Sequence, residues 1–244
     1  MILFLLLACT TEKSIEIHFL PMWKEQHFSC TKGPVTDLRF YISELYSWTE
    51  EGDIRNLNFV PGPLQTDKIA FLDFEDGSGV CKGGSDFTKT SVQIKVPTES
   101  LSGLGFQISV PFSNNHQDPT KARGPLSLSS MHWNWKGGYK FLRMSVREKG
   151  QTPYKIHIGS TGCTGTMGNI SSCKRSNRIA VEIRGYRFSD ATIPIHLDKW
   201  VGDINFSSSG GCMSNPDDEG CRSVFPRLGL DIETGEQNGF AVGF

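Results

Sequence analysis

The chain has 244 residues, enough to bury a full hydrophobic core, and this length is ordinary for one β-sandwich. Its 25 lysines and arginines nearly balance 26 aspartates and glutamates, so no global field favours nucleic acid or an acidic surface. The 26 glycines, 12 prolines and 16 phenylalanines favour many turns between short, aromatic-rich strands and do not suggest helices.

The first nine residues form a continuous apolar run that is too short to cross a bilayer as a helix but fits a secretory signal. Leu6-Leu7-Ala8-Cys9 resembles a bacterial lipobox, in which the cysteine is lipidated and becomes the mature N-terminus. We therefore assign residues 1–14 to a signal and tether, with Cys9 as the lipidation site. This assignment predicts an outer-membrane lipoprotein of the periplasm or cell surface, held to the membrane by its lipid anchor only. The alternative is a hydrophobic N-terminal strand with a free thiol.

Cysteine spacing predicts three disulfides. Without Cys9 the chain holds six cysteines, which are Cys30, Cys81, Cys163, Cys173, Cys212 and Cys221. Two pairs that are close in sequence, Cys163–Cys173 and Cys212–Cys221, would each close a short loop rich in Gly, Ser and Asn, which leaves Cys30–Cys81 by elimination. No CxxC spacing is present, which disfavours a zinc ribbon or a thioredoxin-type motif. The compartment should be oxidising.

Alternating apolar and polar residues predict about ten short strands and no long helix, which is typical of an all-β chain. We expect one domain over residues 15–244, a single-domain antiparallel β-sandwich with disulfide-pinned loops. The predicted strands are Ser14–Leu20, Leu38–Tyr46, Ile54–Val60, a run beginning at Lys68, Thr90–Val96, Leu104–Val110, Tyr139–Val146, Lys155–Gly159, Arg178–Ile183 and Thr192–Leu197. Residues 198–201 fit a helical turn, 215–220 a flexible loop, and 224–230 a short helix or edge strand.

The segment Ser130–Tyr139 contains Trp133 and Trp135 with His132 beside them. In an extended strand, side chains two residues apart share a face, so the two tryptophans would point one way and His132 the other. Two aromatics on one face are most often core. The sharper hypothesis is a site in which histidine and a modified tryptophan hold a metal.

Sequence motifs argue against an enzyme. There is no catalytic-triad order, no Walker or Rossmann glycine pattern and no zincin motif. Gly159-Ser-Thr-Gly-Cys163 has the wrong spacing for a nucleophile elbow, and no helix pattern follows it.

Several spaced segments together resemble the MbnP family, also called metallo-mystery pair four-Cys motif proteins. They are Asp37-Leu-Arg-Phe-Tyr-Ile-Ser, Phe71-Leu-Asp-Phe-Glu-Asp-Gly-Ser-Gly-Val-Cys, Gly103-Leu-Gly-Phe with Val110-Pro and Asn115-His116-x-Asp118, Met131-His-Trp-Asn-Trp-Lys-Gly-Gly-Tyr-Lys-Phe, and His157-Ile-Gly-Ser-Thr-Gly-Cys. The resemblance runs from about Ile15 to Phe244. It implies an exported copper-binding β protein that acts beside a MauG-like di-haem protein. In that family the partner oxidises a tryptophan to kynurenine, and copper binds through kynurenine and histidine.

The resemblance also assigns candidate ligands. Trp133 and Trp135 match the tryptophan motif, with a slight preference for Trp135 as the modified residue. His116 and His157 match the recurrent histidines, and His132 is a third candidate.

The residue types suit this chemistry. Imidazole is a good copper ligand, whereas an intact indole offers only an N–H donor. Ring opening supplies an aniline nitrogen and a ketone. The chain has no haem-attachment Cys-x-x-Cys-His motif, so the oxidant must come from a partner. With so few histidines the site would be low-coordinate, which favours Cu(I).

Two further hypotheses remain open. Trp133, Trp135 and Tyr139 could form a carbohydrate-stacking platform, or the protein could be a structural surface lipoprotein with a buried tryptophan pair. Both predict unmodified tryptophans and no metal.

Overall fold

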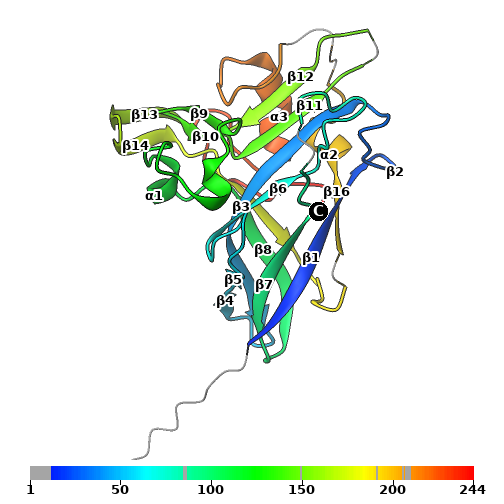
Figure 1. Cartoon of the computed structure of the whole chain (residues 1–244), viewed down its shortest axis with the longest axis vertical. Helices are drawn as coiled ribbons and strands as arrows, with labels where there is room; N and C mark the ends of the chain where they lie inside the picture. The colour runs from blue at the N-terminus through cyan, green and yellow to red at the C-terminus, as the bar shows by residue number, and fades with distance from the viewer. Residues whose placement is uncertain (1–11, 85–86, 149, 191, 205, 207–209) are drawn as a thin grey trace, which may run out of the picture.

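The computed structural model describes residues 12–84, 87–148, 150–190, 192–204, 206 and 210–244. Residues 1–11 of the predicted signal and tether, Cys9 included, lie outside the described residues, whereas residues 12–14 belong to the first strand rather than to a tether. The described chain forms a mostly antiparallel β-sandwich, which confirms the predicted fold class (Figure 1). None of the helices among these residues is long and apolar enough to cross a membrane.

The first sheet has the strand order β16-β1-β7-β5, with β2 paired beside β1. Its strands are β1 (Glu12–Trp23), β2 (Gln26–His27), β5 (Asn58–Phe59), β7 (Ser91–Pro97) and β16 (Thr192–His196). The pair β1–β16 is parallel, and the other pairs are antiparallel. Alternation in β7 buries Val92, Ile94 and Val96, as expected for the strand predicted at Thr90–Val96.

The second sheet is organised around β3, which is 15 residues long and pairs with four other strands. Its strands are β3 (Val35–Thr49), β4 (Ile54–Asn56), β6 (Ile69–Asp73), β8 (Leu101–Ile108), β11 (Leu142–Val146), β12 (Tyr154–Ile158) and β15 (Ile179–Ile183). The main path through this sheet runs β12-β11-β3-β8-β15.

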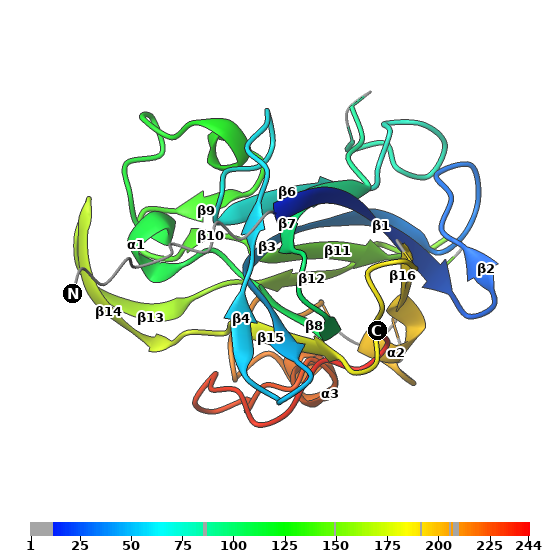
Figure 2. The ribbon, with the colours of Figure 1, turned by 90° about the horizontal axis from the view of Figure 1, so that it is seen from below.

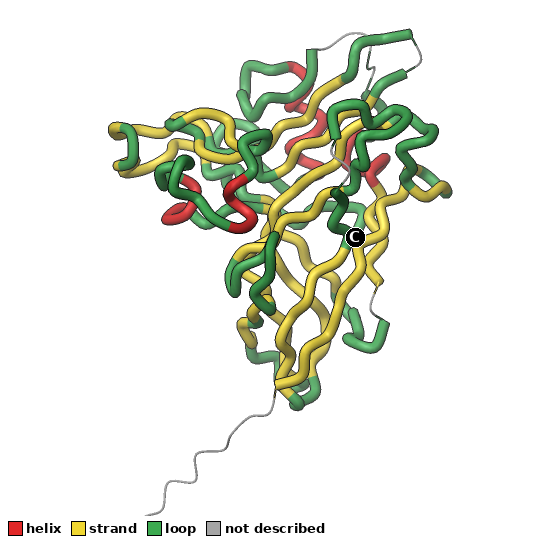
Figure 3. The backbone as a smooth tube through the Cα atoms, in the orientation of Figure 1, coloured by secondary structure: helices red, strands yellow, loops and turns green. Residues whose placement is uncertain are grey.

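Two hairpins and four short helical segments complete the fold. They are β9 (His132–Asn134) with β10 (Gly138–Tyr139), β13 (Thr161–Thr166) with β14 (Asn169–Arg175), α1 (Phe112–Asn115), the 3-10 helix η1 (Gly124–Ser127), α2 (Leu197–Val201) and α3 (Glu219–Arg227). Strands dominate the backbone, and the helices are brief (Figure 3). Figures 1 and 2 place α1 and both hairpins side by side, on the flank where the β13–β14 hairpin projects from the sandwich.

The main core lies between the two sheets. Phe19 of β1 meets Phe40 of β3 and Phe106 of β8 edge to face, with ring centroids 6.3 and 5.9 Å apart. Trp200 of α2 closes one end, because its buried indole donates from Nε1 to the Val242 carbonyl at 2.9 Å. The predicted helical turn at 198–201 is confirmed, because α2 covers Leu197–Val201.

All three predicted disulfides form, namely Cys30–Cys81, Cys163–Cys173 and Cys212–Cys221. The segment around the second is a β-hairpin rather than a simple loop, and its two cysteines lie directly opposite each other. The prediction of a flexible loop at 215–220 was wrong at its end, because α3 begins at Glu219 with Asp218 at its N-cap. Two predicted strands, 54–60 and 139–146, are each divided into two shorter strands.

The second face of β3, which carries Arg39, Tyr41 and Ser43, is also buried. A small apolar cluster covers part of it, formed by Tyr41, Ile69, Phe71, Val110, Met131, Tyr139 and Phe141. The β9–β10 segment supplies Tyr139 to this cluster and so lies over the sheet. Beside the cluster, Arg39 is only 4% exposed, and a buried guanidinium must be paired to be tolerated.

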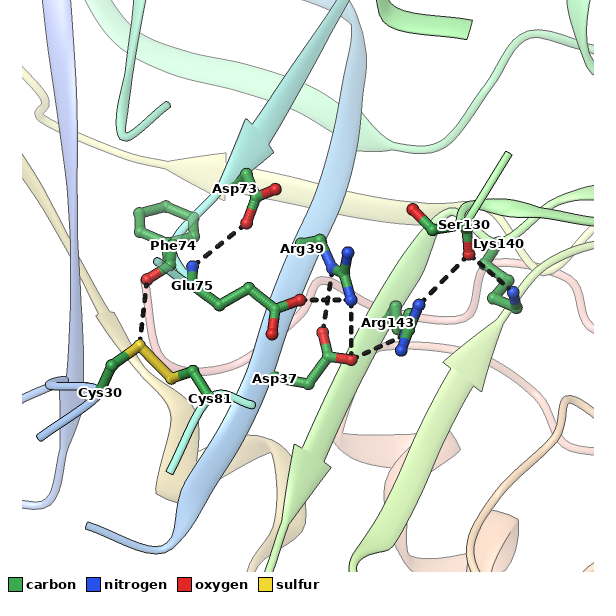
Figure 4. A network of polar contacts seen from close by, with 10 residues as sticks. All are labelled: Cys30, Asp37, Arg39, Asp73, Phe74, Glu75, Cys81, Ser130, Lys140 and Arg143. Carbon is green, nitrogen blue, oxygen red and sulfur yellow. Dashed lines mark hydrogen bonds and ion pairs between the residues drawn. A yellow bond between two sulfur atoms is a disulfide. The ribbon is translucent and has the colours of Figure 1, made fainter. Parts of the chain in front are cut away.

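A charged network satisfies Arg39 (Figure 4). Arg39 donates to both carboxylate oxygens of Asp37, at 3.1 and 3.2 Å, and also pairs with Glu75. Asp37 further pairs with Arg143 of β11 at 2.7 Å. The carboxylate of Asp73 accepts the backbone N–H of Glu75 at 3.1 Å. Burial raises the pKa of Glu75 to about 8, and repulsion from Asp37 adds to this.

The Glu75 pKa predicts how stability depends on pH. The unfolded chain releases this proton near the ordinary value of 4.5, whereas the folded chain holds it to about 8. The folded state therefore binds more protons in this window, and the free energy of unfolding should fall as pH rises through it, by at most about 1.4 kcal/mol per pH unit.

Glu75→Gln should flatten that slope, because the amide resembles the protonated acid at every pH. Urea unfolding of both proteins at several values between about pH 5 and about pH 8 would measure how the free energy of unfolding depends on pH. Glu50→Gln, at an exposed position, is the matched control. An identical slope in the wild type and Glu75→Gln would contradict the prediction.

Candidate metal centre

The tryptophan segment forms the β9–β10 hairpin, and its turn separates the two tryptophans. Asn134 ends β9, and its Oδ1 accepts the backbone N–H groups of Lys136 and Gly137 at 2.9 and 2.8 Å. Trp135 therefore lies in the turn and not in the strand. The prediction that Trp133 and Trp135 share one face of a strand is wrong. Trp135 is 37% exposed, with the Lys136 ammonium 5.3 Å from its ring centroid.

Trp133 lies inside the hairpin and contacts His157. The two rings meet edge to face with centroids 6.3 Å apart, and Trp133 is half-buried. Gly159 allows this approach, because a Cβ at this position would lie 2.6 Å from the Tyr139 carbonyl oxygen and 3.4 Å from the Trp133 ring. The glycine of the His157-Ile-Gly segment thus leaves space for the tryptophan.

His157 occupies β12 at the end of a row of cross-strand neighbours. It lies opposite Arg143, which lies opposite Arg39, which in turn lies opposite Asp73. On the outer edge of β12, the His157 backbone N–H donates to Cys212 at 2.9 Å, and its carbonyl accepts the Ser214 hydroxyl at 2.9 Å. Both strand edges at His157 are therefore tied to other segments.

The His157 side chain has an unused nitrogen. Its Nε2 is buried and has no hydrogen-bond partner within the part of the chain that the structure describes. Burial lowers the pKa of His157 to about 4, and the nearby Lys140 and Arg143 add to this. The imidazole is consequently neutral at physiological pH. A neutral ring with an unpaired buried nitrogen is the state that a metal ligand requires.

His116 lies in a different place, at the C-terminal end of α1. Its ring is buried against Phe112, and its Nε2 is 3.2 Å from Asn115 Nδ2 and 3.4 Å from Cys173 Sγ. His116 Nδ1 is buried and unpartnered among the described residues, and burial lowers the pKa of the ring. This histidine thus contacts the Cys163–Cys173 disulfide.

His132 is the third predicted histidine, and within the described part of the chain its ring packs against Tyr139 rather than against a tryptophan ring. It is half-buried and meets Tyr139 edge to face at 5.3 Å. Burial and the nearby Lys140 lower its pKa. The three candidate histidines therefore have different neighbours. His116 contacts Cys173, His132 contacts Tyr139, and His157 is the one of the three that packs against a tryptophan ring.

A cavity of about 440 Å³ opens beside Trp133. Its walls include Asn134, Cys163 and Met213. Larger cavities of about 590 and 620 Å³ lie near β4 and near the end of β3, but neither has a histidine or cysteine in its lining. The smaller cavity is thus lined by Trp133 and two sulfur-containing residues, Cys163 and Met213, whereas His116, His132 and His157 are not part of its lining.

Sequence reasoning missed Asn115, which positions the hairpin. Its Oδ1 accepts the backbone N–H of Tyr139 at 2.8 Å, and its Nδ2 donates to the Gly137 carbonyl at 3.1 Å and to His116. Asn115 is 1% exposed. The sequence shows that Asn115 directly precedes His116, but it does not indicate that Asn115 binds Gly137 and Tyr139, which lie more than one strand away in the chain.

Comparisons with known proteins point in one direction. The family model described as MbnP matches residues 12–214. Among solved structures, MbnP from Methylosinus trichosporium superposes with a TM-score of 0.81 at 22% identity, over 95% of this chain and 96% of that one. This likeness supports the fold. No curated protein matches the chain.

The contacts of Asn115 predict its importance. Asn115→Ala would leave the Tyr139 N–H and the Gly137 carbonyl without their partner, so it should lower the free energy of unfolding by about 2–4 kcal/mol. Chemical unfolding would measure the change. Asn114→Ala is the matched control, because Asn114 is only half-buried, and it should stay within about 0.5 kcal/mol of wild type. Equal losses in the two variants would contradict this role.

Proposed function

The chain belongs to the MbnP family, and from that premise we propose that it is an exported copper-binding protein whose site joins His157 to a kynurenine formed from Trp133. The observation that carries the proposal is the contact between the Trp133 ring and His157, whose Nε2 is buried without a hydrogen-bond partner. The family resemblance described above supplies copper and kynurenine as the chemistry.

The donor set fits a soft, low-coordinate copper ion. A neutral imidazole is a ligand that copper binds well, and His157 is neutral because burial lowers its pKa to about 4. An intact Trp133 offers no lone pair for a metal, whereas ring opening would add an aniline nitrogen next to His157. We therefore propose Cu(I), which tolerates few ligands. His132 remains a candidate for completing the site, whereas His116 contacts the Cys163–Cys173 disulfide instead.

Trp133 is a better candidate for modification than Trp135. Trp133 touches the histidine and borders the cavity, whereas Trp135 is turned to solvent beside Lys136. A kynurenine at Trp135 would lie beside Lys136, whereas the ring contact with His157 is made by Trp133. We therefore propose Trp133 as the modified residue, in place of the Trp135 that the sequence favoured.

A MauG-like di-haem protein is the oxidant that we propose. The chain carries no haem-attachment motif of its own. The exposed β9–β10 turn, with Trp135 and Lys136 at its tip, would let such a partner approach within a short distance of Trp133. On this proposal the protein binds copper rather than catalysing a reaction, and it acts in the periplasm or at the cell surface.

The carbohydrate alternative loses its stacking platform. Tyr139 is 1% exposed, and its hydroxyl donates to the Leu126 carbonyl at 2.7 Å. A sugar could therefore stack on Trp135 at most, with Trp133 half-covered. This favours the metal site.

The modified residue can be identified by peptide mass mapping, with copper analysis, of protein expressed together with its di-haem partner. We expect the kynurenine mass change at Trp133 and copper in the same preparation. Trp133→Phe should abolish both, whereas Trp135→Phe, the matched control in the same hairpin, should keep both. Intact tryptophans and no copper in the wild type, with the partner present, would refute the proposal.

Substitution of His157 tests the ligand assignment. His157→Ala should remove the stoichiometric copper, because it deletes the imidazole that faces Trp133. His18→Ala removes an exposed histidine on β1 and should leave copper unchanged. His132→Ala, measured in parallel by metal analysis, would show whether that ring completes the site, and His116→Ala should leave this copper in place. Full copper retention by His157→Ala would exclude it as a ligand.

A further inference from the structure

We propose that the Cys163–Cys173 disulfide masks a second metal site, in which His116, Cys163 and Cys173 bind one Cu(I) ion after a dithiol has reduced the disulfide. This site is separate from the Trp133–His157 pair, and it does not depend on the function proposed above.

Three ligand atoms are already gathered at this point. His116 Nε2 and the sulfur atoms of Cys163 and Cys173 all lie within 4.8 Å of one another. The nearest approach to the ring is 3.4 Å, from Nε2 to Cys173 Sγ. A disulfide sulfur is a poor metal ligand, because the thiolate is the binding form of cysteine. In the oxidised protein the three ligand atoms are therefore close enough to share one metal ion, but the two sulfur atoms are bonded to each other and are not thiolates.

The hairpin would keep the sulfur atoms together after reduction. Cys163 and Cys173 face each other across β13 and β14, and the neighbouring pairs Thr161–Arg175 and Thr164–Ser172 continue the ladder on both sides. The Thr164 and Ser172 hydroxyls are also 3.1 Å apart. His116 is held independently by its contact with Phe112, and its Nε2 would exchange the hydrogen bond from Asn115 for the metal ion. The positions of the three groups therefore do not depend on the disulfide alone.

The reduction balances as a thiol–disulfide exchange. One thiolate of the dithiol attacks Cys173 Sγ, forming a mixed disulfide and releasing the Cys163 sulfur as a thiolate. The second thiol of the reductant then displaces Cys173 and closes the reductant's own disulfide. Two electrons pass to the protein, both cysteines become thiols after taking up two protons, and binding of Cu(I) by two thiolates would release those protons again.

This disulfide is the accessible one of the three. Cys173 is half-exposed, whereas Cys30, Cys81, Cys212 and Cys221 are all buried. The hairpin that carries it projects from the sandwich (Figure 2). Cys163 also borders the cavity of about 440 Å³ beside Trp133, which provides a path for a metal ion. A dithiol should therefore open this bond first.

The ligand types select Cu(I) over other ions. Thiolates and thioethers are soft ligands, and Met213 borders the same cavity as Cys163. Zinc would require a fourth ligand for its usual tetrahedral site, and the cluster offers three. Two thiolates and one imidazole suit the low coordination of Cu(I).

The experiment begins with limited dithiothreitol treatment of the whole protein without oxygen. Alkylation and peptide mapping then identify the released thiols, and Cu(I) is titrated in competition with bicinchoninate. We expect Cys163 and Cys173 to be labelled first, and the reduced protein to bind one more Cu(I) than the oxidised protein.

Variants separate this site from the rest of the molecule. His116→Ala should weaken the additional Cu(I) by about 100-fold or more, because even an outer-shell partner contributes ~10- to 100-fold. His18→Ala should leave it unchanged. The double variant Cys163→Ser/Cys173→Ser should gain no copper on reduction. If this variant does not fold, X-ray absorption of the reduced wild type can count two sulfur and one nitrogen ligands.

Trp133→Phe distinguishes the two copper proposals. It removes the site proposed for the oxidised protein but should keep the additional Cu(I) after reduction. The inference is overturned if reduction adds no Cu(I), if another disulfide opens first, if the double serine variant gains the same copper, or if the reduced protein binds Zn(II) but not Cu(I).

Discussion

Burial of Arg39 on the second face of β3 is the constraint on which the site depends. A guanidinium that is 4% exposed must have carboxyl partners, which are Asp37 on β3 and Glu75 after β6, and Asp37 pairs in turn with Arg143 of β11. The same face must also be covered by apolar residues, which the β9–β10 segment supplies. The hairpin that carries the tryptophans is thus held over the sheet by the need to cover it.

That arrangement brings His157 to Trp133. β12 pairs with β11, so the row that begins at Asp73 and Arg39 ends at His157. The hairpin above it presents Trp133 to that histidine, and Asn115 bonds the hairpin backbone from α1. The Cys163–Cys173 hairpin closes the other side of the cavity. Trp133 and His157 therefore both lie on segments that backbone pairing or side-chain hydrogen bonds hold in place.

Most of the fold could be predicted from the sequence because its signals are local. Alternation located strands such as β7, and short sequence separation paired the cysteines. Local rules failed where a side chain reshaped its own backbone: Asn134 accepts two N–H groups, ends β9 and turns Trp135 away. Alternation in β3 also could not indicate that Arg39 and Ser43 are buried, because the segments that cover them are distant in sequence.

The sequence by itself determined the β-sandwich class, the three disulfides and the segments that mark the family. Tertiary structure alone decided which tryptophan meets a histidine and which histidine meets the disulfide. His116 and Cys173 are 57 residues apart, and Trp133 reaches His157 only through packing of one hairpin on a distant strand. Such contacts depend on the whole burial pattern of the sheet, because no local propensity encodes which distant side chain will lie opposite.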